Sequence, residues 1–119
     1  MKHREELRQD LQAIFQAALQ AVDPGVAIRT HMRREGNQLH VDDRTYALSQ
    51  YDALYLVGMG KAGAAMAVAV EKMLGDRLCG GHVIVKYGHG GPVAHVNLHE
   101  ADHPIPDEAG VRATRTLLD

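Results

Sequence analysis

A glycine-rich turn next to a lysine is the stretch of this sequence whose residue types and spacing could do chemistry. Residues 54–57 are apolar, Gly58 and Gly60 follow them, and Lys61 stands just before an alanine-rich segment. Glycine lets a backbone turn sharply and come close to a ligand, and the first N–H groups of a helix have no partner inside the helix. The stretch therefore predicts an anion site, for a phosphate or a carboxylate, at a strand-to-helix turn.

Residues 58–63 also fit the G-x-G-x-x-G pattern of dinucleotide-binding turns. That fold places an acidic residue at the end of its second strand, about 20 residues on, to hold the ribose hydroxyls. Here the second expected strand ends in Lys86-Tyr87, which weakens the NAD interpretation and leaves NADP, whose extra phosphate Lys86 could face. The P-loop pattern is not met, because Met59 alone separates the glycines and Ala62 follows the lysine.

The plain alternative for Lys61 is an exposed lysine at the start of a helix. In that position a positive charge opposes the helix dipole and costs about 0.3–1 kcal/mol, which a bound anion would offset. A lysine at this position is better explained by a bound anion than by an ordinary surface position, so the interpretation of Lys61 as an anion ligand is favoured.

Other polar residues follow the expected strands. Ligands of open parallel sheets bind beyond the carboxyl ends of the strands, so we expect these side chains to lie near Lys61. They are Lys86, His89, His103, Asp107 and Glu108. The eight histidines show no recognisable zinc spacing with a cysteine or an acid, so no structural metal is predicted.

Periodic apolar residues predict the helices that must position these groups. Residues 4–22 carry an apolar stripe at helical spacing that Pro24 brings to an end, and this helix is expected to pack against other elements. Residues 26–32 suggest a second short helix. Residues 62–74, with small side chains on one face, predict a helix that approaches a sheet closely, and another helix is expected to begin near Asp107.

Short apolar or alternating runs predict the strands. Residues 36–48 alternate around the Asp42-Asp43 pair, which indicates a small β-hairpin. Strands of a parallel sheet are expected at 53–57, 82–86 and 93–98. The predicted fold class is α/β, with a mostly parallel sheet flanked by helices and a small β-hairpin after the N-terminal helix.

The last expected helix reaches Asp119 without a cap or a stop signal. A sheet of about three strands that ends in such a helix would leave an open edge and an uncovered face. We therefore expect residues 1–119 to be the N-terminal portion of an incomplete domain of a longer protein, with a frayed natural C-terminus as the alternative. The open edge also predicts dimerisation or aggregation, so a homo-oligomer is expected.

Composition narrows the classes of function. The net charge is −2 over 119 residues, which argues against a nucleic-acid binder with a broad basic surface. No apolar run approaches the roughly 20 residues that span a bilayer, and the charged N-terminus does not resemble a signal peptide. Cys79 is the only cysteine, so no internal disulfide can form, and a cytoplasmic location is expected.

Four segments, in this order along the chain, resemble the type-2 glycerate 2-kinase family, whose members have often been labelled hydroxypyruvate reductases. They are residues 14–24, 58–62, 85–89 and 100–110, so the resemblance covers essentially the whole chain. It implies a Rossmann-like N-terminal domain, a cleft against a smaller C-terminal domain, and phosphorylation of D-glycerate at its 2-hydroxyl with ATP and Mg²⁺.

The resemblance also implies roles for single residues. Lys61 would be catalytic, and the remaining site residues would contact substrate or phosphate, namely Gly58, Gly60, Lys86, His103, Asp107 and Glu108. No ligand for Mg²⁺ is identified in this chain. Asp102 departs from the family pattern, because a small residue, often glycine, usually precedes the His-Pro pair there.

Three functions remain open on the sequence. The first is the front part of a glycerate kinase that is inactive without the rest of the enzyme. The second is an NADPH-dependent reductase of hydroxypyruvate. The third is a non-catalytic anion-binding remnant.

Overall fold

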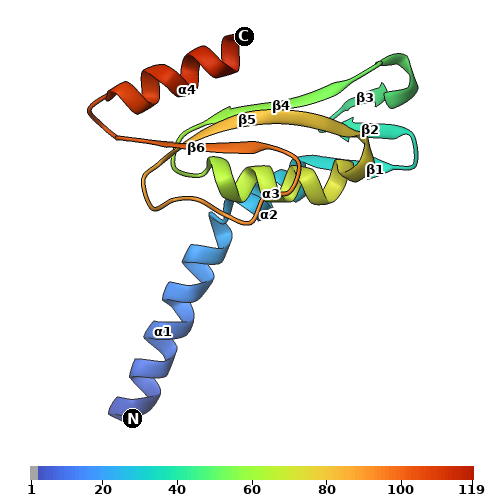
Figure 1. Cartoon of the computed structure of the whole chain (residues 1–119). Coiled ribbons are helices and arrows are strands. Elements are labelled where there is room, and N and C mark those ends of the chain that lie inside the picture. The colour runs from blue at the N-terminus through green and yellow to red at the C-terminus, as the bar shows by residue number, and fades with distance from the viewer. Residues whose placement is uncertain (1–2) are drawn as a thin grey trace.

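The computed structural model describes residues 3–119, which form four α-helices and two separate three-stranded sheets (Figure 1). The elements, in chain order, are α1 (Arg4–Ala21), α2 (Pro24–His31), β1 (Met32–Glu35), β2 (Gln38–Val41), β3 (Arg44–Ala47), β4 (Leu54–Met59), α3 (Gly63–Leu74), β5 (Leu78–Lys86), β6 (Asn97–Ala101) and α4 (Glu108–Leu118).

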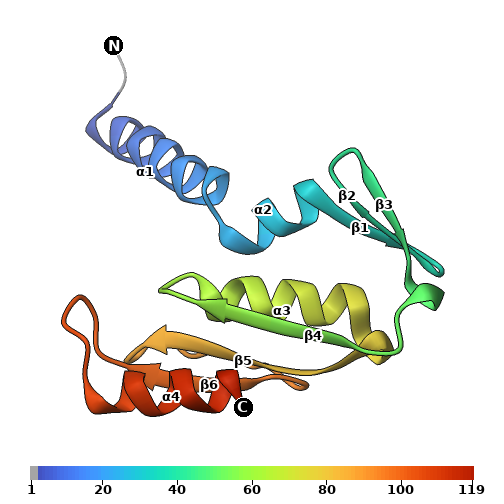
Figure 2. The same cartoon turned by 90° about the horizontal axis from the view of Figure 1, so that it is seen from above.

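The sheet that carries the site is parallel, in the order β4-β5-β6, with β5 in the middle. Helix α3 lies on one face of it and α4 on the other, as Figures 1 and 2 both show. The core consists of small and β-branched side chains of α3, β5 and the segment before β6, with Ala67 and Val83 each only 1% exposed. The predicted α/β class and the parallel sheet are confirmed.

The small side chains of α3 bring this helix close to the sheet. A Cβ at Gly63 would lie 2.9 Å from Val83 Cγ1 and 3.3 Å from Val85 Cγ1. Heavy atoms in van der Waals contact stay about 3.5–4.0 Å apart, so this position admits only glycine without movement. The start of α3 is thereby fixed directly above β5.

Strand β5 is longer than predicted, nine residues from Leu78 in place of the expected 82–86. In the sequence, the pair Gly80-Gly81 suggests that a strand is interrupted, but in the structure both glycines belong to β5. A Cβ on Gly81 would overlap the backbone of Leu56 on the neighbouring strand, so glycine permits a close approach of β4 and β5.

Strand β6 begins at Asn97 and not at the predicted residue 93. The residues before it bond to a side chain of α3: the N–H groups of Ala94, His95 and Val96 donate to the Glu71 carboxylate at 2.8, 2.6 and 2.9 Å. Glu71 is only 7% exposed. Burial raises the pKa of Glu71, but the three N–H bonds together outweigh it and hold the pKa below the ordinary value.

Replacing Glu71 by glutamine is expected to destabilise the fold by about 2–4 kcal/mol, because the amide leaves at least one of the three N–H groups, that of Val96 being buried, without its acceptor. The native pKa of Glu71 is lowered, so ionised Glu71 stabilises the fold at neutral pH. That stabilisation declines as the pH falls below the ordinary glutamate pKa, about 4.3, and through the native pKa. Urea unfolding at neutral and acidic pH measures both effects.

The matched control is Glu5→Gln, which alters an exposed carboxylate on α1 that has no hydrogen-bond partner among residues 3–119. The two variants should differ in stability at neutral pH and converge in acid. A Glu71→Gln protein as stable as the Glu5→Gln protein at neutral pH would contradict the assigned role.

The second sheet is antiparallel, in the order β1-β2-β3. The predicted hairpin with Asp42-Asp43 at its turn is confirmed, with β2 and β3 as its strands and Asp42 at a φ of 50°. The structure adds β1, which pairs with β2. Arg34 on β1 fastens this sheet to the end of α3, donating to the Leu74 carbonyl at 2.5 Å and to Asp76 at 3.1 Å.

Helix α2 begins earlier than the predicted residue 26. Asp23 accepts a hydrogen bond from the Val26 N–H at 2.7 Å, and Pro24 occupies the first turn, where no N–H is needed. The proline that ends the first helix therefore also begins the second.

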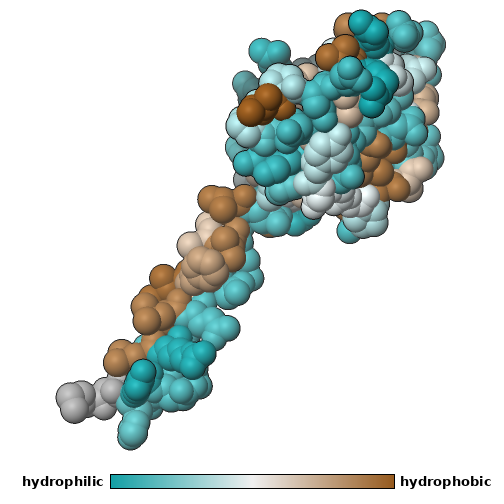
Figure 3. Space-filling view, turned by 60° about the vertical axis from the view of Figure 1, so that its left-hand side comes forward, coloured by the Kyte–Doolittle hydropathy of each residue, from teal (hydrophilic) through white to brown (hydrophobic). Residues whose placement is uncertain are grey.

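Helix α1 is confirmed over Arg4–Ala21, but it has no buried residue and projects from the rest of the chain (Figures 1 and 3). In its apolar stripe, Leu11, Ile14 and Phe15 are each more than 60% exposed. The expectation that this helix packs against other elements is therefore not met within residues 3–119. None of the helices in this range is both long and apolar enough to cross a membrane.

Candidate functional site

The glycine turn that the sequence singles out joins the end of β4 to the start of α3. Gly60 has a φ of 111°, a conformation that favours glycine, and its N–H donates to the Ile84 carbonyl on β5 at 2.9 Å. Ala62 is the N-cap of α3 and offers no side-chain acceptor. The turn is thus tied to the sheet, while the first N–H groups of the helix receive no side-chain cap.

A cavity of about 160 Å³ lies at this turn. It is lined by Met59, Gly60, Lys61, Ile84, Val85, Lys86, Ala101, Asp102 and His103. The three strands of the parallel sheet end here, at Met59, Lys86 and Ala101. The cavity therefore has the position that ligands take in open parallel sheets.

Three ionised side chains line this cavity. The side chains of Lys61 and Lys86 have no hydrogen bond and no ion pair in the described part of the chain. Asp102 Oδ1 accepts a hydrogen bond from the His103 N–H at 2.7 Å. Two ammonium groups and one carboxylate thus have bonding capacity left for a ligand.

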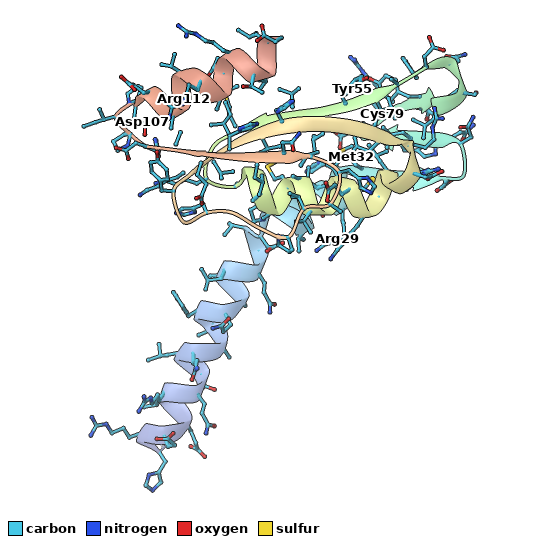
Figure 4. The ribbon with its side chains drawn as sticks, in the orientation of Figure 1. Arg29, Met32, Tyr55, Cys79, Asp107 and Arg112 are labelled. Carbon is cyan, nitrogen blue, oxygen red and sulfur yellow. The ribbon has the colours of Figure 1, made fainter. Side chains whose placement is uncertain are left out.

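A second set of contacts holds the loops beside the cavity. The Tyr87 hydroxyl donates to Asp107 Oδ2 at 2.8 Å, and Asp107 Oδ1 accepts from the Gly110 N–H at 2.8 Å. These bonds, the Gly110 N–H first, lower the pKa of Asp107, and the bond to Asp107 raises the pKa of Tyr87. Asp107 thereby caps α4 and ties it to the end of β5 (Figure 4).

The structure brings four of the predicted site residues together, Gly60, Lys61, Lys86 and His103. Four others, His89 among them, lie outside the cavity lining. Gly58 is inside β4, where a Cβ would lie 3.4 Å from Val83; Asp107 is the N-cap of α4; and Glu108 is exposed, 3.6 Å from Arg112.

Sequence reasoning did not select every residue of the cavity. Asp102 stood out only as a departure from the family pattern. The third strand was expected to end at residue 98, whereas β6 runs to Ala101, directly before Asp102. The side chains of Met59 and Ala101 are apolar, so nothing in the sequence marks them as site residues. They line the cavity because they are the last residues of β4 and β6.

The histidines do not gather into a metal centre within residues 3–119. That range holds no group of three or more His, Cys, Asp or Glu side chains that could bind a metal ion. His82 Nδ1 and His99 Nε2 do form a hydrogen bond of 2.8 Å between neighbouring strands.

A protein family described as "Domain of unknown function (DUF4147)" matches residues 10–119. The match includes α1 from residue 10 onward, both sheets and all the residues of the cavity.

Individual proteins match the same region. A protein of Agrobacterium vitis, provisionally named a hydroxypyruvate reductase, is 34% identical over 93% of this chain and 22% of its own length. The D-glycerate 2-kinase of Thermotoga maritima is 42% identical over 57% of this chain and 16% of its own length. A crystal structure of a glycerate kinase from Thermotoga maritima superposes with a TM-score of 0.67 and 28% identity, over 96% of this chain and 24% of that one. The chain thus spans about a fifth of the length of these relatives.

Proposed function

This chain belongs to the DUF4147 family, the N-terminal part of type-2 glycerate kinases, and from that premise we propose that the complete protein phosphorylates D-glycerate. The reaction would transfer a phosphoryl group from ATP to the 2-hydroxyl. The observation that carries the proposal is the cavity at the strand ends, where Gly60 and Lys61 meet Lys86 and His103.

The charges of the cavity support this chemistry. Phosphoryl transfer depends on positioning and on stabilising negative charge. Lys61, at the uncapped start of α3, and Lys86, at the end of β5, both direct positive charge toward the same small space. We assign Lys61 to the stabilisation of charge that develops on the transferred group, and Lys86 to the binding of substrate.

ATP supplies the phosphoryl group, and Mg²⁺ would neutralise part of its charge. The described residues suit the negatively charged phosphate groups, because the side chains of two lysines in the cavity have no partner within residues 3–119. Residues 3–119 contain no group of three or more His, Cys, Asp or Glu side chains that could bind a metal ion. We therefore assign no residue of this chain to Mg²⁺.

The 119-residue chain by itself is expected to show no kinase turnover above background. The reason is that this chain spans about a fifth of the length of its relatives, and we propose that the remaining part supplies further nucleotide and metal contacts. Phosphoryl transfer requires the metal and the cations together. A coupled assay of ADP release with D-glycerate, ATP and Mg²⁺ measures this. The control is a polypeptide of the relatives' length that carries this chain, which should be active; turnover by the 119 residues alone would contradict the prediction.

The second candidate function is reduction of hydroxypyruvate with NADPH. It is favoured by the provisional name of the Agrobacterium vitis relative and by Lys86 at the end of β5, where a 2′-phosphate could bind. Nicotinamide fluorescence separates the two candidates on the polypeptide of full family length. NADPH binding and oxidation with hydroxypyruvate, without ATP-dependent product, would replace the kinase proposal.

A further inference from the structure

The cavity holds one charge that the proposed roles of the lysines leave unexplained, the carboxylate of Asp102. Its Oδ1 is engaged by the His103 N–H at 2.7 Å, while Oδ2 takes no hydrogen bond within residues 3–119. No ion pair joins it to Lys61 or Lys86. The carboxylate is therefore neither neutralised nor fully bonded by the protein itself.

The negative charge of this carboxylate lowers the net charge of the cavity and so sets the ligand charge that fits best. The formal charges of the two lysines and of Asp102 add up to one positive unit in the cavity. A monoanion matches that charge. A dianion held by the same lysines would lie beside Asp102, and repulsion between charges a few ångströms apart at a protein surface weakens binding by about tenfold or more.

The carboxylate also decides which polar group a ligand should carry. An ionised carboxylate only accepts hydrogen bonds, so Oδ2 of Asp102 would accept one from a hydroxyl. The cavity volume of about 160 Å³ equals about five water molecules at roughly 30 Å³ each. That volume suits an acid of three or four carbons.

We propose that Asp102 is a specificity-determining residue that selects small hydroxy acids and rejects their phosphorylated forms. Lys86 binds the acid's carboxylate, as proposed above, and Oδ2 of Asp102 accepts the hydrogen of its hydroxyl. This inference rests on the proposed function for the identity of the reaction. It adds a cause for product release, because a phosphorylated product would place a dianion next to Asp102.

Three probes test this on the isotope-labelled 119-residue chain, without nucleotide. D-Lactate and propionate differ by one hydroxyl, and inorganic phosphate is used at a pH where it is a dianion. Amide shifts of Gly60, Lys61 and Asp102 report binding. We expect D-lactate to bind about two- to tenfold tighter than propionate, the value of one hydrogen bond, and phosphate to bind more weakly than D-lactate.

Two variants separate charge from hydrogen bonding. Asp102→Asn keeps the shape and the acceptor for His103 but removes the charge, so phosphate affinity should rise about tenfold. Asp102→Ala removes the acceptor, so the D-lactate to propionate ratio should fall to about one. Asp43→Asn, the same chemical change in the hairpin turn, should alter neither quantity.

Unchanged phosphate affinity in Asp102→Asn would overturn the proposal, as would a wild-type chain that binds none of the probes or binds phosphate as well as D-lactate. If Asp102→Ala perturbs amides throughout the chain, the isosteric Asn variant still decides. The outcome is separate from that of the kinase test, because a full-length protein without kinase activity would refute the proposed function and leave these binding ratios in place.

Discussion

Replacing Gly81 by alanine is expected to prevent the parallel sheet from forming. A Cβ at this position would overlap the carbonyl group of Leu56 on β4, and backbone cannot move aside as a side chain can. Relief requires β4 and β5 to separate where they are paired, at Leu56↔Gly81. We expect a loss above about 4 kcal/mol, comparable with the 5–15 kcal/mol that stabilises a typical domain.

The neighbouring glycine provides the matched control. Gly80 has nearly the same φ, 155° against 156°, but its added Cβ would lie 3.8 Å from the nearest atom, the His95 carbonyl oxygen. Gly80→Ala therefore carries the conformational cost without the overlap. Amide spectra and urea unfolding should show a folded Gly80→Ala protein and an unfolded Gly81→Ala protein. Equal stability of the two would show that the strands tolerate the extra methyl group.

Replacing Lys61 by alanine is expected to lower kcat by about ten- to a hundredfold in a polypeptide of the relatives' length. A charge-assisted hydrogen bond contributes about 1.5–3 kcal/mol, and each 1.36 kcal/mol of transition-state stabilisation is tenfold in rate. The loss should appear in kcat and not only in KM if the bond strengthens in the transition state. Steady-state kinetics with varied D-glycerate separates the two.

Lys72 gives the control for this change. It is an exposed lysine on the same helix, in its last turn, and it does not line the cavity at the strand ends. Lys72→Ala should leave kcat unchanged within about twofold, since surface substitutions usually change free energies by less than 0.5 kcal/mol. If Lys61→Ala behaves in the same way, Lys61 is an ordinary surface lysine.

Sequence patterns predicted the elements with strong local signals. The apolar periodicity of α1 and α3, the alternation around Asp42 and the apolar run of β4 each reflect forces between near neighbours in the chain. The start of β6 could not be predicted, because it depends on Glu71, more than twenty residues earlier, which bonds the backbone just before the strand. The extension of β5 through Gly80-Gly81 depends likewise on the proximity of another strand.

The candidate site was predictable in part for the same reason. Gly60, Lys61, Lys86 and His103 were chosen because they follow expected strands, and parallel strands bring such residues to one edge. The different surroundings of Asp107 and Glu108 could not be read from the sequence. Which carboxylate caps α4, and which only faces solvent, depends on the direction in which the helix leaves the sheet.

The projecting helix α1 has a consequence for how the chain melts. Isolated helices shorter than about 12–15 residues are marginal in water, and α1, with 18 residues, is only slightly longer. Little stabilises it beyond its own hydrogen bonds and the Glu6 carboxylate, which accepts from the His3 N–H. Its coil–helix equilibrium is thus independent of the sheets. Heating should unfold α1 gradually, while the sheets and the helices packed on them unfold in one cooperative step. A single midpoint temperature therefore does not describe the unfolding of the 119 residues.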